Sequence, residues 1–146
     1  MSIIPQSGIN EIRFGSHLIS VSQVFVLRKN VFAIINHKPF VSGHVLVCSR
    51  RVVAKIQDLT EIEVLDLFIT AQEIVRKMET IYKVSCQMVI QNGAEAGQTV
   101  KHAHIHVVPN STRVEREDDD KREPRSQEDM AQEAEVYRPH FEQSFQ

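Results

Sequence analysis

The 146-residue sequence has no tryptophan, only two cysteines, and no long hydrophobic run. Two cysteines are too few for the disulfide framework of a small secreted domain, so we expect Cys48 and Cys86 to be buried free thiols. No run approaches the roughly 20 apolar residues of a membrane span, and the first residues do not resemble a signal peptide. We therefore expect a soluble protein of the cytoplasm, and also of the nucleus, with no membrane partner.

The sequence also lacks a large excess of one charge. The net charge is -2 at pH 7, but residues 113–135 hold ten acidic against five basic side chains, which leaves the rest of the chain mildly basic. This excess is too small and too dispersed for a nucleic-acid surface, although it is compatible with a small phosphorylated ligand. With 42% hydrophobic residues, the chain suits a single domain over residues 1–146 with one core.

The apolar pattern predicts several short strands and one long helix. Strands are expected over residues 13–19, 23–27, 31–35, 44–48 and 84–90.

The long helix is expected over residues 60–82, where Thr60 and Glu63 form a capping box. Its apolar residues recur at helical spacing, and we expect this stripe to form core or a subunit contact. The stripe consists of Leu65, Phe68, Ile69, Val75, Met78 and Tyr82.

Three histidines alternate with small or aliphatic residues near position 100. A period of two is typical of a β-strand, so His102, His104 and His106 are expected to share one face of a strand that ends at Pro109. At a rise of about 3.3 Å per residue, their rings stand roughly 6 to 7 Å apart, and one small anionic or metallic centre can touch several of them. The preceding loop, residues 91–100, contains glycines that let backbone N–H groups approach an anion.

Three interpretations of the histidine cluster remain open: a zinc site, a structural set, and nucleophilic catalysis on phosphorus. A neutral imidazole attacks phosphorus without first losing a proton and forms a covalent phosphoramidate. A zinc hydrolase normally has carboxylates that orient its histidines, whereas only Glu95 lies nearby in this loop and strand. The other nearby groups are amides, hydroxyls and backbone donors, which favours a phosphate and no metal held by the three histidines.

Residues 102–108, His-Ala-His-Ile-His-Val-Val, match the histidine-triad (HIT) pattern His-X-His-X-His-X-X, where X is apolar. The flanking segments narrow the resemblance to the fragile-histidine-triad (Fhit) branch, the diadenosine triphosphate hydrolases. These segments are residues 13–15, 38–39, 43–48 and 95–102. The resemblance implies an α+β fold, with one long helix packed on an antiparallel sheet, and a homodimer.

The resemblance covers about residues 12–110 and resumes in a helix expected over about 126–138. A mobile acidic loop, about 111–125, separates the two parts. The chain has Asn92, Ala94 and Ser42 where the branch usually has Asp, Pro and Pro, and none of these changes removes a reacting group.

The resemblance also implies a role for each site residue. His104 is similar to the nucleophile that attacks the α-phosphorus, while His102 and His106 are similar to flanking members that bind phosphate oxygens and hold the nucleophile's tautomer. His44 resembles a supporting fourth histidine, and Asn36 resembles the ribose contact. The remaining nucleotide and phosphate contacts are expected from His17, Gln91, Gly97, Gln98, Thr99 and Val100.

The implied reaction is hydrolysis of diadenosine triphosphate to AMP and ADP through an adenylyl-His104 intermediate. Magnesium or manganese is expected with the polyphosphate and not as a ligand of the triad. The expected partners are a dinucleoside polyphosphate or nucleotide and a second copy of the chain. Two alternatives stay open: a nucleoside phosphoramidate hydrolase, and a nucleotide-binding signalling module whose substrate complex is the output.

Overall fold

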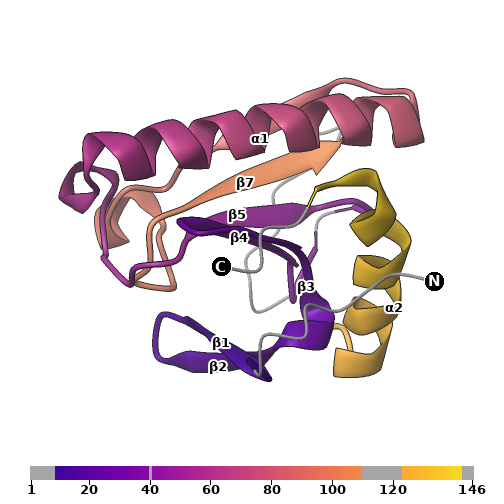
Figure 1. Ribbon diagram of the computed structural model, residues 1–146, viewed down its shortest axis with the longest axis horizontal. Coiled ribbons are helices and arrows are strands. Elements are labelled where there is room, and N and C mark those ends of the chain that lie inside the picture. The colour runs from indigo at the N-terminus through magenta and orange to yellow at the C-terminus, as the bar shows by residue number, and fades with distance from the viewer. Residues whose placement is uncertain (1–8, 40, 110–122, 143–146) are drawn as a thin grey trace.

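The computed structural model describes residues 9–39, 41–109 and 123–142, so most of the acidic loop expected over residues 111–125 lies outside the described residues. A hairpin of two antiparallel strands precedes a five-stranded antiparallel sheet with the order β3-β4-β5-β7-β6 (Figure 1). The predicted α+β class is confirmed. In chain order the elements are β1 (Glu11–Phe14), β2 (His17–Ser20), β3 (Val24–Leu27), β4 (Val31–Ile35), β5 (Val45–Ser49), α1 (Glu61–Tyr82), β6 (Cys86–Val89), β7 (His104–Pro109) and α2 (Gln127–Tyr137).

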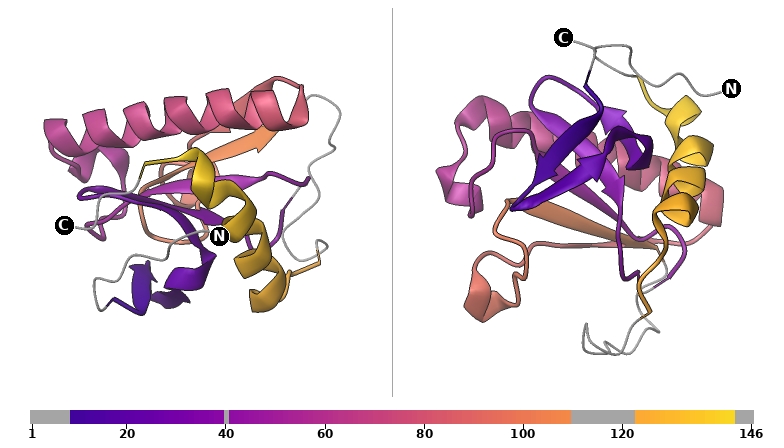
Figure 2. Two further views of the ribbon diagram at one scale, coloured as in Figure 1. Left: turned by 45° about the vertical axis from the view of Figure 1, so that its right-hand side comes forward. Right: turned by 90° about the horizontal axis from the view of Figure 1, so that it is seen from below.

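The five-stranded sheet separates two apolar layers. Side chains of α1 and α2 share one core with alternate residues of the strands, including Ile105 and Val107 of β7. The β1–β2 hairpin packs against the opposite face, where Leu46 and Cys48 of β5 lie (Figures 1 and 2). Because side chains alternate along a strand, His104 and His106 point away from α1 and toward the hairpin side.

Helix α1 begins as predicted. The Thr60 hydroxyl accepts a hydrogen bond from the Glu63 N–H at 3.2 Å, and the Glu63 carboxylate accepts one from the Thr60 N–H at 2.9 Å. This capping box satisfies two of the donors that a helix N-terminus leaves without a partner.

The predicted apolar stripe of α1 is only partly correct. Met78 is buried, and Val75 and Tyr82 pack partly buried against the core. In contrast, Leu65, Phe68 and Ile69 are 58%, 39% and 44% exposed. The face that packs on the sheet differs from the predicted one, because Leu65 and Ile69 lie on the side of α1 opposite the buried residues. Its fully buried apolar residues are Leu67, Ala71, Ile74 and Met78.

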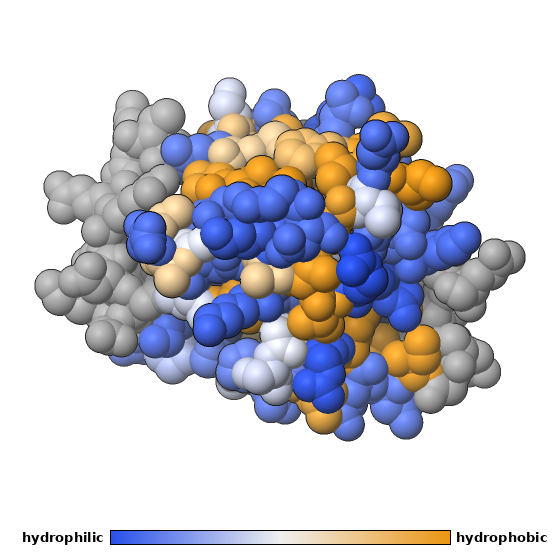
Figure 3. All heavy atoms as spheres, turned by 90° about the vertical axis from the view of Figure 1, so that its left-hand side faces the viewer, coloured by the Kyte–Doolittle hydropathy of each residue, from blue (hydrophilic) through white to orange (hydrophobic). Residues whose placement is uncertain are grey.

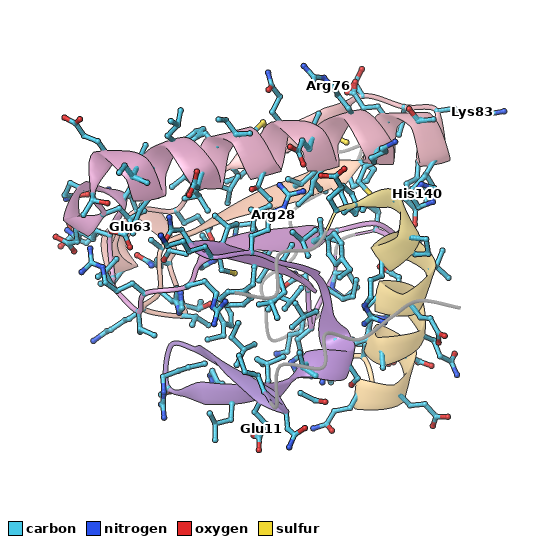
Figure 4. The ribbon with its side chains drawn as sticks, in the orientation of Figure 1. Glu11, Arg28, Glu63, Arg76, Lys83 and His140 are labelled. Atoms are coloured by element: carbon cyan, nitrogen blue, oxygen red, sulfur yellow. The ribbon has the colours of Figure 1, made fainter. Side chains whose placement is uncertain are left out.

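Two arginines form hydrogen bonds that connect α1 to the sheet and to the loop before the helix. Arg28, at the end of β3, donates to the Thr70 hydroxyl at 3.2 Å and to the Glu73 carboxylate at 2.7 Å, and it lies between α1 and the sheet (Figure 4). Arg51 donates to Glu63 in the first turn of α1 at 2.8 Å. These contacts fix the long helix along the sheet.

The N-terminal strands differ from the prediction. The stretch 13–19 is not one strand but the end of β1, a turn at Gly15, and β2. Gly15 has φ +59°, and a Cβ there would come within 2.7 Å of a Val100 methyl group. Only glycine combines this backbone conformation with so close an approach to the neighbouring chain.

The other predicted elements need smaller corrections. The strand predicted over 44–48 is shifted by one residue to become β5, and the strand predicted over 84–90 shortens to β6. The C-terminal helix is confirmed as α2, with Ser126 as its N-cap, and a 3-10 turn over Arg138–His140 follows it.

Both cysteines are free thiols, as predicted. Cys48 is fully buried, but Cys86 is only partly buried because β6 is an edge strand, so the prediction that both are buried is wrong for Cys86. In the described part of the chain, neither α-helix combines the length and the hydropathy needed to cross a membrane.

Candidate active site

The triad histidines lie where β7 begins, on the side of the sheet that faces the hairpin. His104 and His106 belong to β7 and are paired with Cys48 and Leu46 of β5. His102 precedes the first residue of β7, so the predicted continuous strand is confirmed for His104 and His106 but not for His102. The polypeptide bends at His102 and turns its ring toward the hairpin.

The His102 ring is buried and hydrogen-bonded at both nitrogens. Its Nδ1 accepts a hydrogen bond from the Gly15 N–H at 2.9 Å, so its Nε2 carries the proton and donates to the Ser49 carbonyl at 2.6 Å. Burial lowers the pKa of His102, although the bond to Ser49 opposes this effect. No ring nitrogen of His102 remains for a phosphate oxygen, so the expectation that this ring binds phosphate is corrected.

His102 instead acts on His104 through its backbone. The His102 carbonyl oxygen lies 2.5 Å from His104 Nδ1. A carbonyl only accepts hydrogen bonds, so Nδ1 of His104 carries the proton and Nε2 holds the lone pair. Burial lowers the pKa of His104, the bond to the His102 carbonyl opposes this, and the His102 ring adds to the lowering. His104 is therefore held as a neutral imidazole with a nucleophilic Nε2.

An aromatic side chain from the hairpin sets the position of these two rings. The Phe14 ring centroid lies 5.4 Å from that of His102 and 5.2 Å from that of His104, and it meets His104 edge-on. Phe32 of β4 also packs against His102, with centroids 5.8 Å apart. The hairpin thus fixes the His104 ring from outside the sheet.

His44, the fourth histidine of the site, lies next to His106. His44 Nε2 lies 3.0 Å from His106 Nδ1, so one of these two rings donates to the other. The Asn36 side-chain amide lies 3.2 Å from His44 Nδ1 and donates to the Lys38 carbonyl at 3.1 Å. The structure therefore brings Asn36, His44, His106 and His104 together, as the resemblance to the histidine-triad family implied.

The loop before the triad is held by two side-chain amides. Gln98 accepts from the Gly93 N–H and donates to the Ala54 carbonyl, both at 2.7 Å. Asn92 accepts from the Ile56 N–H at 2.9 Å and donates to Gln57 at 2.8 Å. An ionised aspartate could not make the second of these Asn92 bonds, so Asn92, one of the departures from the branch pattern, is used in closing the loop.

The residues of this loop that were expected to contact a ligand lie in different environments. Gln91 lies against Gly97, where φ is +94° and a Cβ would come within 2.7 Å of the Gln91 amide nitrogen. Thr99 is exposed. Val100 packs against the core under the hairpin, and both polar ends of Gln98 are bonded within the protein. Gln98 and Val100 therefore have structural roles here, and their contacts with a ligand stay predictions.

Sequence reasoning missed several residues at the site. Phe14, the Gly15 N–H and the Ser49 carbonyl all contact the triad, whereas His17, which was expected there, is exposed on β2 of the same hairpin. A glycine between two strand-like stretches was the available signal for the turn. That signal does not reveal a contact with a histidine 87 residues away.

The donor set does not suit a three-histidine zinc site. A zinc ligand uses the lone pair of one ring nitrogen, but the one lone pair of His102 already accepts from Gly15. Across residues 9–39, 41–109 and 123–142, no group of three or more His, Cys, Asp or Glu side chains has the arrangement of a metal site.

The antiparallel sheet with its row of histidines defines a protein of the histidine-triad class. The chain matches the HIT domain family over residues 20–113, and it belongs to that family. It is 40% identical over 139 residues to the bis(5'-adenosyl)-triphosphatase of Dictyostelium discoideum, covering 90% of this chain and 93% of the relative. It is also 43% identical over 97 residues to a bifunctional bis(5'-adenosyl)-triphosphatase/adenylylsulfatase of Arabidopsis thaliana, over 66% of this chain and 54% of that one.

Solved structures agree with this assignment. The C. elegans NitFhit protein matches with a TM-score of 0.80 and 38% identity, over 90% of this chain and 30% of that one. The Plasmodium falciparum diadenosine triphosphate hydrolase, solved with Cyclomarin A, matches with a TM-score of 0.74 and 27% identity, over 93% and 87% of the two chains. The predicted membership of the histidine-triad superfamily and the resemblance to Fhit-type proteins are confirmed.

Proposed function

We propose that this protein hydrolyses diadenosine triphosphate to AMP and ADP with His104 as the nucleophile. One observation carries the proposal: the hydrogen bond from His104 Nδ1 to the His102 carbonyl leaves the lone pair on Nε2. The relatives that are named bis(5'-adenosyl)-triphosphatases support the choice of substrate.

In the first step, His104 Nε2 attacks the α-phosphorus. A P–N bond forms as the P–O bond to the leaving group breaks, and ADP departs with the bonding electrons. The ring gains positive charge in this step, and the His102 carbonyl oxygen stabilises it because the proton on Nδ1 becomes more acidic. No base is needed, since a neutral imidazole has no proton on the attacking atom.

In the second step, water attacks the same phosphorus and the P–N bond breaks. AMP is released, the protons lost by water pass to solvent, and His104 returns to its neutral form. His106, whose ring is oriented by His44, is placed to contact a phosphate oxygen in both steps. A magnesium or manganese ion bound to the polyphosphate would balance its charge, while Asn36 and Gln91 contact the nucleotide.

The test is mass spectrometry of the intact protein after rapid mixing with diadenosine triphosphate and acid-free quench. We expect an adduct with the mass of an adenylyl group, together with AMP and ADP in solution. A His140→Ala variant, which removes an exposed histidine, should form the same adduct. Turnover without any adduct would overturn covalent catalysis, and tight binding without turnover would favour a signalling module.

The pH dependence follows from the lowered pKa of His104. Only the neutral His104 ring attacks, and burial lowers the pKa of this ring below its ordinary value of 6.5. We therefore expect kcat/KM to remain at its plateau at pH 6.5 and to decline only in more acidic solution. Stability should fall over the same range, because below pH 6.5 the unfolded chain takes up protons that the folded chain excludes. A pH–rate profile and urea unfolding between about pH 5 and 8 test both. An acid limb centred above pH 6.5 would contradict the assignment.

We also propose that the chain forms a homodimer through α1 and the sheet edge at β6. Cys86 packs into the core beneath α1, so alternation along β6 places Met88 on the same face. Leu65 and Ile69 are exposed on the outer side of α1, and Met88 is exposed at the β6 edge. In the view of Figure 3, orange hydrophobic side chains lie among blue hydrophilic ones across the upper and central part of the molecule. An apolar face beside an open strand edge suits a two-fold contact with an identical chain. Its exposed apolar residues are Ile62, Leu65, Phe68, Ile69, Met88 and Ile90.

Leu65→Glu is expected to convert the dimer to a monomer, because it places a charge in the centre of this apolar face. Light scattering after gel filtration should give twice 16.7 kDa for the wild type and 16.7 kDa for the variant. Val136→Glu is the matched control, because Val136 is equally exposed but lies on α2. A wild type that is monomeric at micromolar concentration would contradict the proposed dimer.

A further inference from the structure

The loop from Asn36 to His44 is held at both ends by other parts of the chain. It is closed by the Asn36 N–H, which donates to the His44 carbonyl at 3.1 Å. Near its start, the His37 carbonyl accepts from the Arg125 N–H at 2.8 Å. Near its end, Gly43 lies so close to the Tyr82 ring that a Cβ would come within 2.6 Å of it. Contacts from outside the loop are therefore made at His37 and at Gly43, near its two ends.

Both contacts lead to the same stretch of helix α2. The Arg125 guanidinium donates to the Glu133 carboxylate at 2.7 Å, and the two side chains are 24% and 16% exposed. The Tyr82 hydroxyl is hydrogen-bonded to the hydroxyl of Tyr137, which lies one helical turn beyond Glu133. Arg125, Glu133, Tyr137 and Tyr82 thus form a connected set, which we call the α2 clamp.

The charge of Glu133 affects both halves of the α2 clamp. It pairs with the partly buried Arg125, and it lies one helical turn before Tyr137 on the same face of α2. Burial, the bond to Tyr82 and the charge of Glu133 all raise the pKa of Tyr137, so its hydroxyl stays protonated. Removing the Glu133 charge takes away the carboxylate partner of the partly buried Arg125 guanidinium, which keeps its contact with the Asp129 carbonyl but is held less firmly.

We propose that Glu133 is a positioning residue for substrate binding: through Arg125 and the Tyr137–Tyr82 pair it holds the 36–44 loop so that Asn36 meets the nucleoside of the substrate. This inference rests on the proposed function. His104 is held separately, by the His102 carbonyl and by Phe14. Loosening the α2 clamp should therefore weaken binding and leave the chemical step nearly unchanged.

The first experiment compares Glu133→Gln with the wild type in steady-state hydrolysis of diadenosine triphosphate. Glutamine keeps the shape of the side chain and removes its charge. We expect KM to rise roughly five- to tenfold, the range of one lost hydrogen bond, while kcat changes by less than about twofold. Arg125→Gln should act in the same direction. Glu128→Gln, an exposed position on the same helix, is the matched control and should leave both constants unchanged.

Two further measurements separate positioning from a general loss of stability. Hydrogen exchange of the Asn36 and His44 amides, both bonded within the loop, should be faster in Glu133→Gln than in Glu128→Gln. In an Asn36→Ala background, Glu133→Gln should raise KM no further, because the contact it positions is already gone. An unchanged KM in Glu133→Gln, or a full additive effect in the Asn36→Ala background, would overturn the inference. Absence of turnover in the wild type would instead overturn the proposed function.

Discussion

Replacing His104 with alanine is expected to reduce the hydrolysis of diadenosine triphosphate by about four orders of magnitude or more, the usual effect of removing a catalytic nucleophile. The loss should appear in kcat, because the variant lacks the imidazole Nε2 at position 104 that would form the adenylyl intermediate. Substrate affinity should be nearly retained, since His106, Asn36 and the 91–100 loop are untouched. The measurement is single-turnover product formation together with equilibrium binding by calorimetry.

The variant also needs a test of its fold, because the His104 ring contacts Phe14 and the His102 carbonyl. His104→Asn retains a polar side chain at the same position and should be as inactive as His104→Ala while unfolding at nearly the wild-type temperature. Residual turnover above about 1% of the wild-type rate in both variants would show that another group attacks the phosphorus.

The local sequence pattern was enough to predict the face on which the reacting groups lie. Alternation places His104 and His106 on one side of β7. The proximity of Asn36 and His44, which flank the loop between β4 and β5, was implied by the family resemblance and not by the strand period. The prediction for β7 succeeded because a strand with one face in a core cannot shift by one residue without exposing that core.

The position of His102 could not be predicted from alternation. The ring leaves the strand because it has two partners that lie far away in the sequence, the Gly15 N–H and the Ser49 carbonyl. Satisfying the half-buried Gly15 N–H in the turn of the hairpin outweighs the regular extension of one strand by two residues. A pattern with period two contains no information about such a contact.

The face of α1 that packs on the sheet also could not be predicted from the sequence. Leu67, Ala71, Ile74 and Met78 form the buried side, but Leu65 and Ile69 lie on the opposite side of the helix and are exposed. When a helix carries apolar residues on opposite sides, its sequence pattern alone does not tell which side is buried. The exposed part remains available for the proposed second subunit.

His102 is the residue through which the hairpin contacts His104, the proposed nucleophile. Its ring bonds to Gly15 in the turn of the hairpin, its carbonyl holds His104, and the ring lies between Phe14 and Phe32. The position of the His102 carbonyl, and therefore the tautomer of His104, depends on how this ring is packed. The lowered pKa of His102 keeps this arrangement intact, because a second proton on the ring would occupy Nδ1 and break its hydrogen bond with the Gly15 N–H.

His102→Ala is therefore expected to lower both stability and kcat, although no atom of the ring touches the reacting phosphorus. The Gly15 N–H and the Ser49 carbonyl lose their partner in a buried site, which should reduce the free energy of unfolding by about 2–5 kcal/mol. A shift of the carbonyl that holds His104 Nδ1 should lower kcat by about 100-fold, the effect of a misplaced catalytic group. Urea unfolding and kcat at 15 °C, with the exposed His140→Ala as control, measure both effects. A destabilised variant with wild-type kcat would mean that the His104 tautomer is maintained without the His102 ring.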